Sequence, residues 1–450
     1  MKTRTLSNPS NTDFLSSDAL RRYHANALRA LLAGCRTHPA LADRLTAGLS
    51  DRLLSSPDMT SAWSLIPEGR SYDQSAYITD KSLCGIIPGN ADGRVVFSTT
   101  GSAGAPKLIV NAYEEVMNNA QIHGKGYGAC GICADDIAVI LGEVGRFAFG
   151  YTVIRALSTT GCTIVPLAMQ ECIADNLNIM NELRASVCVT MQSQLFRYLD
   201  TLEAGLIEAP PLRLIITGGE ATSLKVAGRL KAIFGENLLL RSVFQTADAG
   251  TIGYQCPWCE EGEFHLHEEL QFTEIIGADG GATKETGRLL VTNLYRLHSP
   301  VIRMATGDRA QWSGSDRRCQ CGRTSRRLVL RGRDDHFYKL GGEKIASHSL
   351  IELLDTLDLP VDSARLVISR SDDGMDALFL EARPELGGPG LQRKVEKIFR
   401  DAAALQPLVA RQCLAPIRVR AFARDDPHHR GFDKIKRIVD RRNEVAGEAE

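Results

Sequence analysis

The sequence contains no run of about 20 consecutive apolar residues, the length that a bilayer-spanning helix needs. Its first residues also lack an apolar segment between their charges and a cleavage site, so we predict a cytoplasmic protein without a membrane partner. An excess of one charge is missing as well, because Lys and Arg number 53 and Asp and Glu number 54. This balance disfavours a dedicated nucleic-acid-binding protein, and we predict no nucleic-acid partner.

Internal repeats and low-complexity segments are absent too. With 44% hydrophobic and 24% charged residues, the composition is that of a folded globular protein and excludes wholesale disorder. The 450 residues correspond to two to four domains at about 100 to 200 residues per domain. A protein that acts on a small molecule is therefore the starting hypothesis.

The periodicity of apolar residues predicts how the chain is organised. Residues 17–56 have helical spacing, and from about residue 94 short β-rich runs alternate with helical stretches, which indicates a layered α/β domain. Residues 262–312 predict an antiparallel or barrel-like subdomain. The predicted strands are 95–97, 137–141, 163–165, 187–189, 212–216 and 238–243, and the predicted helices are 113–122, 171–184 and 223–234.

A second domain is expected after Arg333. The pattern there predicts a helix, two strands, a helix, a strand and a basic, partly helical tail, which is the content of a small α+β domain. We therefore predict an α/β fold class with a large layered domain over 1–333, including the β-rich subdomain, and a small α+β domain over 334–450. The predicted elements of the small domain are helices 347–357 and 390–402 and strands 364–369, 376–382 and 415–422.

One loop has the composition of a phosphate-binding segment. Residues 98–107, Ser-Thr-Thr-Gly-Ser-Ala-Gly-Ala-Pro-Lys, directly follow a predicted strand and precede a helix. Backbone N–H groups and hydroxyls in such a loop can hold phosphate oxygens, and Lys107 adds a positive charge. The segment matches neither the Walker A pattern nor G-x-G-x-x-G. Taken alone, it is more typical of an ordinary Gly/Ser turn.

Two close pairs stand out among the 12 cysteines, Cys256 with Cys259 and Cys319 with Cys321. In a reducing compartment such spacing indicates a metal site before a disulfide. Four thiolates suit a tetrahedral zinc ion, which would clip residues 256–321 together without an open catalytic position. His265 is an alternative ligand, and buried free thiols are the simpler alternative to a metal site.

Several motifs, in the right order, resemble those of the adenylate-forming superfamily, which includes acyl-CoA synthetases, adenylation domains and luciferases. The loop is similar to that family's S-S-G-T-T-G-x-P-K, with Ala103 at a usual threonine. The later matches are Thr-Gly-Gly-Glu at 217–220, Phe-Gln-Thr-Ala-Asp at 244–248, Arg-Met-Ala-Thr-Gly-Asp at 303–308, Gly-Arg-Asp-Asp at 332–335 and Lys-Ile-Lys-Arg at 434–437.

The resemblance implies a role for each matching residue. Nucleotide binding is implied for Thr99, Thr100, Gly101, Ser102, Lys107, Gly218, Gly219, Glu220, Phe244, Gln245, Asp308 and Arg333. Asp248 stands where the family holds magnesium, although the family has Glu there, and Asp335 would be the hinge of a mobile small domain. Lys434 would be the catalytic lysine, whereas its basic neighbours favour a solvated tail if they are considered alone.

The implied activity is ATP-dependent activation of a carboxylic acid as an acyl-adenylate, with transfer to coenzyme A. Features such as Pro-Val-Ile-Arg at 300–303 most resemble the phenylacetate-CoA ligase-like branch, whose substrates are aryl acids. By analogy, Phe147, Phe149 and Tyr151 would line the acyl pocket, as an alternating aromatic strand. Expected cofactors are ATP, Mg²⁺, structural Zn²⁺ and coenzyme A, and a homodimer is an expected assembly.

Three other functions stay open at this point. Departures at Ala103, Gln245, Asp248 and Asp433 leave room for an amine or a carrier protein as acceptor in a secondary-metabolite pathway. Arginines around Cys319 leave room for a zinc-ribbon interaction module. A catalytically inactive, ligand-binding relative is the third alternative.

Overall fold

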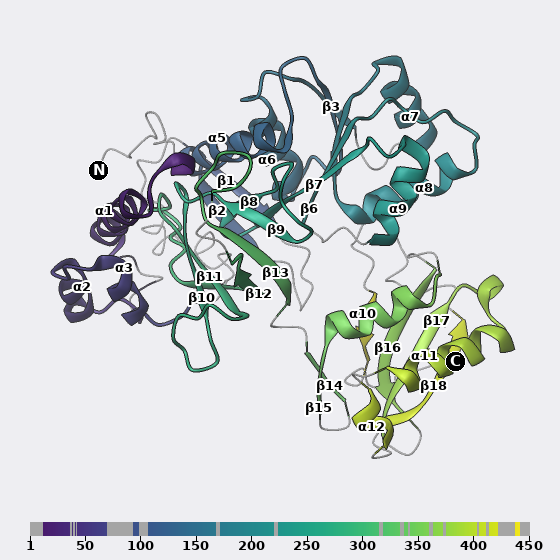
Figure 1. Ribbon diagram of the computed structural model, residues 1–450. Helices are drawn as coiled ribbons and strands as arrows, with labels where there is room; N and C mark the ends of the chain where they lie inside the picture. The colour runs from purple at the N-terminus through teal and green to yellow at the C-terminus, as the bar shows by residue number, and fades with distance from the viewer. Residues whose placement is uncertain are drawn as a thin grey trace. The chain divides into compact units, whose positions relative to one another are not determined.

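The structure is a computed structural model that describes residues 12–36, 38, 41, 43–69, 93–98, 107–167, 172–219, 224–314, 318–333, 337–340, 343–359, 363–371, 375–402, 405–410, 414–421 and 437–441. The chain divides into two compact units, Met1–Arg331 and Gly332–Glu450, which are described separately (Figure 1). Among the described helices, none has the length and apolarity needed to cross a bilayer.

An 11-stranded sheet forms the centre of the first unit, in the order β10-β11-β12-β13-β9-β8-β7-β6-β5-β3-β4. Its strands are β3 (Ile137–Leu141), β4 (Thr163–Leu167), β5 (Val187–Thr190), β6 (Leu214–Gly218), β7 (Leu239–Thr246), β8 (Gly250–Tyr254), β9 (Glu263–Leu266), β10 (Gln271–Ile276), β11 (Gly287–Asn293), β12 (Met304–Trp312) and β13 (Arg327–Arg333). The five strands from β4 to β7 run parallel, and β7 then pairs antiparallel with β8.

The layered α/β fold is therefore confirmed, with one correction. Residues 262–312 do form antiparallel strands, as predicted, but these strands continue the same sheet and form no separate barrel. The reason is that β8 pairs with both β7 and β9, so backbone hydrogen bonding runs without a break from the parallel half into the antiparallel half.

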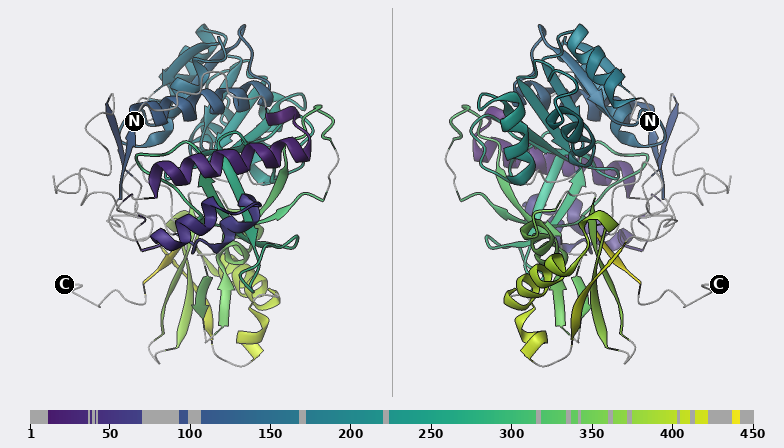
Figure 2. Two further views of the ribbon diagram at one scale, coloured as in Figure 1. Left: turned by 90° about the vertical axis from the view of Figure 1, so that its left-hand side faces the viewer. Right: turned by 90° about the vertical axis from the view of Figure 1, so that its right-hand side faces the viewer.

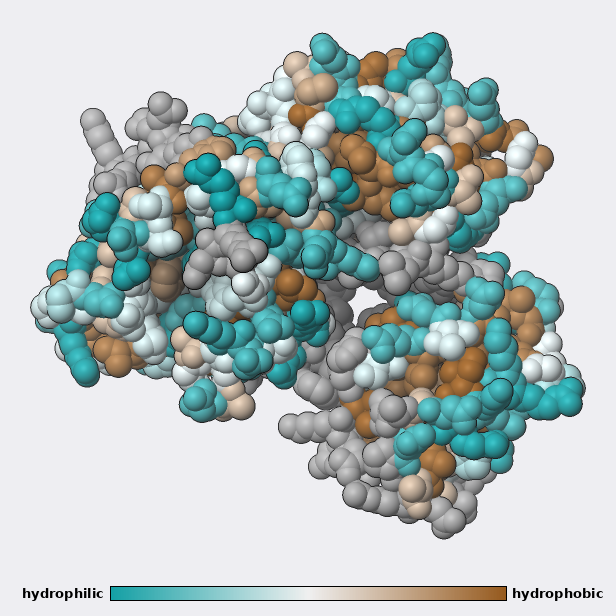
Figure 3. All heavy atoms as spheres, viewed as in Figure 1, coloured by the Kyte–Doolittle hydropathy of each residue, from teal (hydrophilic) through white to brown (hydrophobic). Residues whose placement is uncertain are grey.

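Helices cover both faces of the parallel strands, because these strands are apolar on both sides. The helices are α5 (Tyr113–Cys130), α6 (Ala148–Leu157), α7 (Ile173–Glu182), α8 (Gln192–Glu203) and α9 (Leu224–Phe234). Tyr127 of α5 and Val153 of α6 pack against Ile140 and Ile216 on one face. Residues of α7, α8 and α9 line an apolar space with Cys188 on the other, and apolar side chains of this helical region also reach the surface in Figure 3.

The N-terminal helices cover the antiparallel half of the sheet, as Figure 2 shows for α1. They are α1 (Ser17–Cys35), α2 (Ala47–Leu54) and α3 (Met59–Ala62), with short 3₁₀ segments at Thr12–Phe14 and Trp63–Leu65. Leu28, Leu31 and Trp63 pack against Phe272 and Ile302. The prediction that helices open the chain is confirmed.

The predicted strand 95–97 lies outside the main sheet. Among the described strands, β1 (Arg94–Ser98) pairs only with β2 (Leu108–Ala112), in a separate antiparallel pair whose register joins Ser98 to Leu108. Helix α5 follows β2 without a break.

The second unit contains a hairpin, β14 (Phe337–Leu340) with β15 (Glu343–Ala346), and a four-stranded sheet in the order β18-β17-β16-β19. The sheet strands are β16 (Ala364–Arg370), β17 (Asp376–Ala382), β18 (Leu414–Ala421) and β19 (Ile438–Asp440), and the helices are α10 (Ser347–Thr356), α11 (Pro389–Asp401) and α12 (Gln406–Ala410), with a 3₁₀ segment at Pro384–Leu386. Every element predicted over 347–422 is confirmed. The partly helical tail is wrong at 438–440, because β19 pairs in parallel with β16 and Ile438 joins the core.

Candidate functional site

The carboxyl ends of the parallel strands bring together residues that are distant in sequence. Gly142 directly follows β3, Thr190 ends β5, Gly218 ends β6 and Thr246 ends β7. The Thr190 hydroxyl donates a hydrogen bond of 2.8 Å to the carbonyl of Leu141, which ties β5 to β3 at this edge. In open α/β sheets, ligands bind outside this edge. It is therefore the candidate site.

The Phe149 ring lies across this edge. A Cβ atom built on Gly142 would stand 2.6 Å from Cε1 of Phe149, so only glycine fits beneath the ring. A Cβ on Gly218 would lie 3.9 Å from Phe149 Cε2 and 3.7 Å from Gln245 Nε2. Phe149, Gly218 and Gln245 therefore form one wall, with an aromatic face, a bare backbone and an amide.

The expected row of three aromatic side chains is corrected by the structure. Residues 148–157 form helix α6, so Phe149 and Tyr151 are about 200° apart around the helix rather than on one strand face. Phe147 lies at the N-cap beneath Arg146, and Tyr151 packs against Phe97 of β1 at 5.9 Å between ring centroids. Burial and the neighbouring Tyr113 raise the pKa of Tyr151. Of the three residues, Phe149 is the one that faces the strand ends.

The turn from Thr246 to Gly250 carries Asp248 at the same edge. The Thr246 hydroxyl accepts a hydrogen bond of 3.0 Å from the Ala249 N–H, and Gly250 has φ of 80°. The Arg296 guanidinium donates to the carbonyl of Asp248. The amides of Gln271 and Asn293 donate to the carbonyl of Ala249, at 2.9 and 3.0 Å. The backbone that carries the Asp248 carboxylate is thus fixed from three sides.

Sequence reasoning missed these supporting residues. Gln271 begins β10, Asn293 ends β11, and Arg296 follows in the next turn. Their amide and guanidinium groups reach the turn only because the sheet brings β10 and β11 beneath it. Both Gln271 and Arg296 are buried, with exposed fractions of 0% and 5%. In the sequence, the only sign of such a role is a polar residue within an otherwise apolar strand. This sign does not reveal which group the polar side chain binds.

Other predicted nucleotide contacts have more ordinary surroundings. Phe244 is 8% exposed and packs against Phe264 at 5.9 Å between centroids, in the core of the antiparallel half. Nucleotide binding by Phe244 therefore stays a prediction. Asp308 is 9% exposed on β12, and its N–H donates to the Thr306 hydroxyl at 3.1 Å. Lys107 is partly buried at the base of the loop, and Gly219 is exposed with φ of 76°.

Some expected site residues lie outside the described residues, and their roles stay predictions. These are Thr99, Thr100, Gly101, Ser102, Glu220, Asp335 and Lys434, together with the side chain of Arg333.

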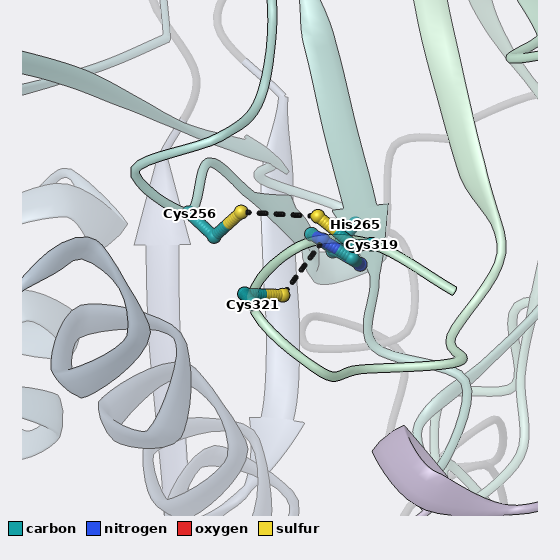
Figure 4. Close-up of side chains that lie close together, drawn as sticks. All are labelled: Cys256, His265, Cys319 and Cys321. Atoms are coloured by element: carbon teal, nitrogen blue, oxygen red, sulfur yellow. Dashed lines mark hydrogen bonds between the residues drawn. The ribbon is translucent and has the colours of Figure 1, made fainter. Parts of the chain in front are cut away.

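Cys256 of the first pair meets both cysteines of the second pair and His265 in the folded chain, as Figure 4 shows. Cys256 follows β8, His265 lies on β9, and Cys319 and Cys321 lie between β12 and β13. The ligand atoms of these four residues are all within 4.8 Å of one another. The Cys259 sulfur is 3.6 Å from the Cys256 sulfur but lies outside this group of four. Among the described residues, the geometry thus favours His265 over Cys259.

The spacing fits a tetrahedral metal ion. The Cys256 and Cys319 sulfurs are 3.6 Å apart, and the Cys321 sulfur is 3.5 Å from His265 Nε2. Ligand atoms around one tetrahedral zinc ion lie about 3.5 to 3.8 Å apart. Ser325 is 3.0 Å from His265 Nδ1, which orients the ring with Nε2 toward the sulfurs. The Cys259 thiol and burial raise the pKa of Cys256, and burial raises the pKa of Cys319 to about 12, so a bound metal displaces protons.

Comparison with known proteins supports this architecture. No protein-family model matches the chain. A salicylyl-CoA synthase / salicylate adenylyltransferase from a Streptomyces species is 24% identical over 357 residues, covering 71% of this chain. The chain spans 58% of the length of that curated relative.

Two solved structures have a similar fold. A 2-hydroxyisobutyryl-CoA ligase in its postadenylation state matches with a TM-score of 0.73 and 14% identity, covering 96% of this chain and 93% of that one. An anthranilate CoA ligase matches with a TM-score of 0.55 and 16% identity, covering 73% and 62%. The fold is thus that of acid-CoA ligases. In fold and over part of its sequence, the chain is similar to enzymes of the adenylate-forming superfamily.

Proposed function

We propose that this protein activates a carboxylic acid with ATP as an acyl-adenylate and transfers the acyl group to coenzyme A. The fold match over 96% of the chain carries the proposal. A sequence match to a relative named as a salicylyl-CoA synthase supports it independently. Placement in the phenylacetate-CoA ligase-like branch stays a prediction.

The chemistry requires cations and fixed donors at one point. Adenylation brings a carboxylate against the α-phosphate of ATP, and the two anions repel each other until donors and cations compensate the charge. The Asp248 carboxylate is a hard oxygen ligand on a rigid turn, which suits Mg²⁺ bound to the ATP phosphates. Magnesium reduces the charge on these phosphates when it is bound. Lys107 and, by resemblance, residues 99–102 and Lys434 would supply further donors.

An aryl acid is the substrate class that the wall of the site favours. The Phe149 ring lies directly on Gly142 and close to Gly218, so a flat ring can approach both an aromatic face and bare backbone. The Gln245 amide beside them can bind a polar substituent of that ring. Relatives and structural neighbours named for salicylate and anthranilate act on aryl acids, which supports the same class.

The cysteine cluster fits one structural zinc ion held by Cys256, His265, Cys319 and Cys321. Four protein ligands leave no open coordination position on the ion. We therefore assign it a structural role, in which it cross-links β8, β9 and the segment before β13. These ligands join parts of the main sheet, which disfavours an independent zinc-ribbon module. Association as a homodimer stays a prediction, and light scattering tests it.

A panel of acids tests the proposed function. Pyrophosphate exchange should depend on ATP, Mg²⁺ and an added acid, with salicylate, anthranilate and benzoate better than 2-hydroxyisobutyrate or acetate. Thioester should appear only with coenzyme A. Pyrophosphate exchange without thioester formation would indicate that the acyl acceptor is an amine or a carrier protein rather than coenzyme A. No exchange with any acid would reject adenylation and favour an inactive relative.

A further inference from the structure

A buried ion pair between Arg296 and Glu115 lies next to the turn that carries Asp248. The proposed reaction gives this pair no direct role. Arg296 is 5% exposed, and its Nε lies 4.0 Å from a carboxylate oxygen of Glu115. Both groups also share the hydroxyl of Ser299, which accepts from Arg296 Nε at 3.2 Å and donates to Glu115 at 3.2 Å. Burying two charges costs desolvation free energy that their attraction often fails to recover, so stability alone is a weak reason for this pair.

Each end of the pair holds a different backbone segment. Arg296 donates to the carbonyl of Asp248, the residue proposed to hold magnesium. Glu115 accepts the N–H of Ala112 at 3.2 Å, at the junction where β2 ends and α5 begins. Ala112 pairs with Arg94 of β1, at the end of the hairpin opposite Ser98 and Leu108. One buried network therefore connects the turn that carries Asp248 to the junction between β2 and α5.

The charges of the network are balanced. Glu115 Oε1 also accepts the N–H of His298 at 2.9 Å, so both of its oxygens are engaged. A lone guanidinium beneath Asp248 would compete electrostatically with a divalent cation above it. Paired with Glu115, Arg296 fixes the Asp248 backbone without adding net charge there.

Resting on the proposed function, we propose that Arg296, paired with Glu115, is a positioning residue that sets magnesium affinity by holding the Asp248 turn in place against the start of α5. Neither side chain needs to touch the substrate for this role. Loss of Arg296 would allow the Asp248 carboxylate to move, and loss of Glu115 would leave the positive charge of Arg296 unpaired near Asp248. Either change should therefore weaken the binding of Mg²⁺ together with ATP.

Binding of ATP to the full chain, measured by calorimetry from EDTA to millimolar Mg²⁺, tests this inference without requiring an acid. Wild type should bind ATP more tightly as Mg²⁺ rises. Arg296→Met should raise the half-saturating Mg²⁺ concentration by about tenfold, the usual effect of losing an outer-shell partner of a metal ligand. Its ATP affinity in EDTA should stay within about twofold of wild type, because the phosphate donors are unchanged. Arg296→Lys should restore part of the Mg²⁺ affinity.

Two further variants sharpen the test. Glu115→Gln should shift the Mg²⁺ curve in the same direction, and the double variant should shift it less than the sum, because both changes break one network. Arg213→Met is the matched control. Arg213 pairs with the buried Asp136 at 3.0 Å, at the amino ends of β3 and β6, on the opposite edge of the same sheet. It should lower thermal stability and leave the Mg²⁺ curve unchanged.

A merely structural role predicts a different result. Arg296→Met would then melt at a lower temperature, as Arg213→Met does, with a Mg²⁺ curve superimposable on wild type, and the inference would be rejected. The inference would also be rejected if the ATP affinity of the wild type did not depend on the Mg²⁺ concentration. Failure of the proposed function is distinguishable, because ATP binding would then depend on Mg²⁺ and on Arg296 while no acid supports pyrophosphate exchange.

Discussion

The cysteine cluster offers five candidate side chains for the four ligand positions of one tetrahedral metal ion. Residue types and spacing in the sequence are sufficient to predict a zinc site there. They are insufficient to choose between His265 and Cys259, because both lie a few residues from Cys256 along the chain. The choice depends on β9, which carries His265 beside Cys321.

Zinc content separates these two ligands. Purified wild type and Cys259→Ser should both contain about one zinc per chain, because Cys259 lies outside the group of four. Cys319→Ser should lose most of its zinc and melt at a lower temperature. Elemental analysis by mass spectrometry measures the content. Full zinc in Cys319→Ser, or none in Cys259→Ser, would contradict the assignment.

A buried histidine should make stability depend on pH. His123 is fully buried in α5, stacks on Tyr127 at 4.4 Å, and has no hydrogen-bond partner for its ring among the described residues. Burial, with a smaller effect of His267, lowers the pKa of His123 to about 3. The unfolded chain, with a histidine pKa near 6.5, therefore binds more protons between these values. Stability is fully present above about pH 6.5 and is lost as the pH falls toward 3.

His123→Phe keeps the stacked ring and removes the titration. Between about pH 7.5 and pH 5, wild type should lose about 2 kcal/mol of unfolding free energy through this residue, and the variant should lose that much less. Urea denaturation at both pH values measures the difference. Equal losses in the two proteins would show that His123 is not the titrating group.

Lys434 is the residue whose role depends most on the family resemblance. If it stabilises the charge that develops at the α-phosphate, Lys434→Ala should fold and bind ATP but lose roughly 10² to 10³ in adenylation rate. Acyl transfer from a preformed adenylate should change much less. Comparing pyrophosphate release with thioester formation measures both, and unchanged pyrophosphate release would reject the assignment.

Helix α6 shows how an element decides what its residues can do. The alternation of Phe147, Phe149 and Tyr151 is compatible with a strand or with the first turn of a helix, because short apolar runs are ambiguous by period. Tertiary packing selects the helix, since Gly150 allows α6 to begin against the backbone of Glu143. As a consequence, Phe149 faces the strand ends and Tyr151 faces β1.

The contact between α6 and the end of β3 provides a test. Gly142→Ala places a methyl group 2.6 Å from Phe149 Cε1, so the ring must move. We expect a loss of about 1 to 3 kcal/mol in stability and weaker binding of the aryl acid, with ATP binding unchanged. Gly128→Ala on α5, where a Cβ meets nothing within 4 Å, is the control and should be neutral or stabilising. Unchanged acid affinity in Gly142→Ala would remove Phe149 from the acyl site.

At the scale of the whole molecule, each of the two units has apolar cores of its own. Leu366, Leu380 and Phe399 belong to a core formed entirely by the second unit, whereas Tyr254 and its neighbours belong to the first unit, with the cysteine cluster. Removal of zinc should therefore affect the first unit alone.

Hydrogen exchange of the full chain, with and without a zinc chelator, checks this expectation. Segments of β8, β9 and β13 should lose protection after chelation, because the clip that joins them is gone. Segments of β16 and β17 should exchange at the same rate in both conditions. Equal loss of protection in both units would mean that they unfold as one cooperative body.

The sequence by itself determined much of the local structure and the chemistry of the site residues. In the second unit, periodicity predicted α10, α11 and three of the four sheet strands but missed the hairpin of β14 and β15, α12 and β19. The helices and strands that it found follow from the spacing of apolar residues a few positions apart. Motif order indicated the resemblance to the adenylate-forming superfamily, and cysteine spacing indicated a candidate metal site. None of these inferences needs a contact between distant segments.

Only the tertiary structure decided how distant segments meet. It placed β1 in its own hairpin, joined the antiparallel strands to the parallel sheet, and brought Ile438 back beside β16. It also selected His265 for the cysteine cluster and carried Gln271, Asn293 and Arg296 beneath the Asp248 turn. The physical reason is the same in each case. Strand pairing and buried hydrogen bonds join residues tens to hundreds of positions apart, and no local pattern specifies which partner they find.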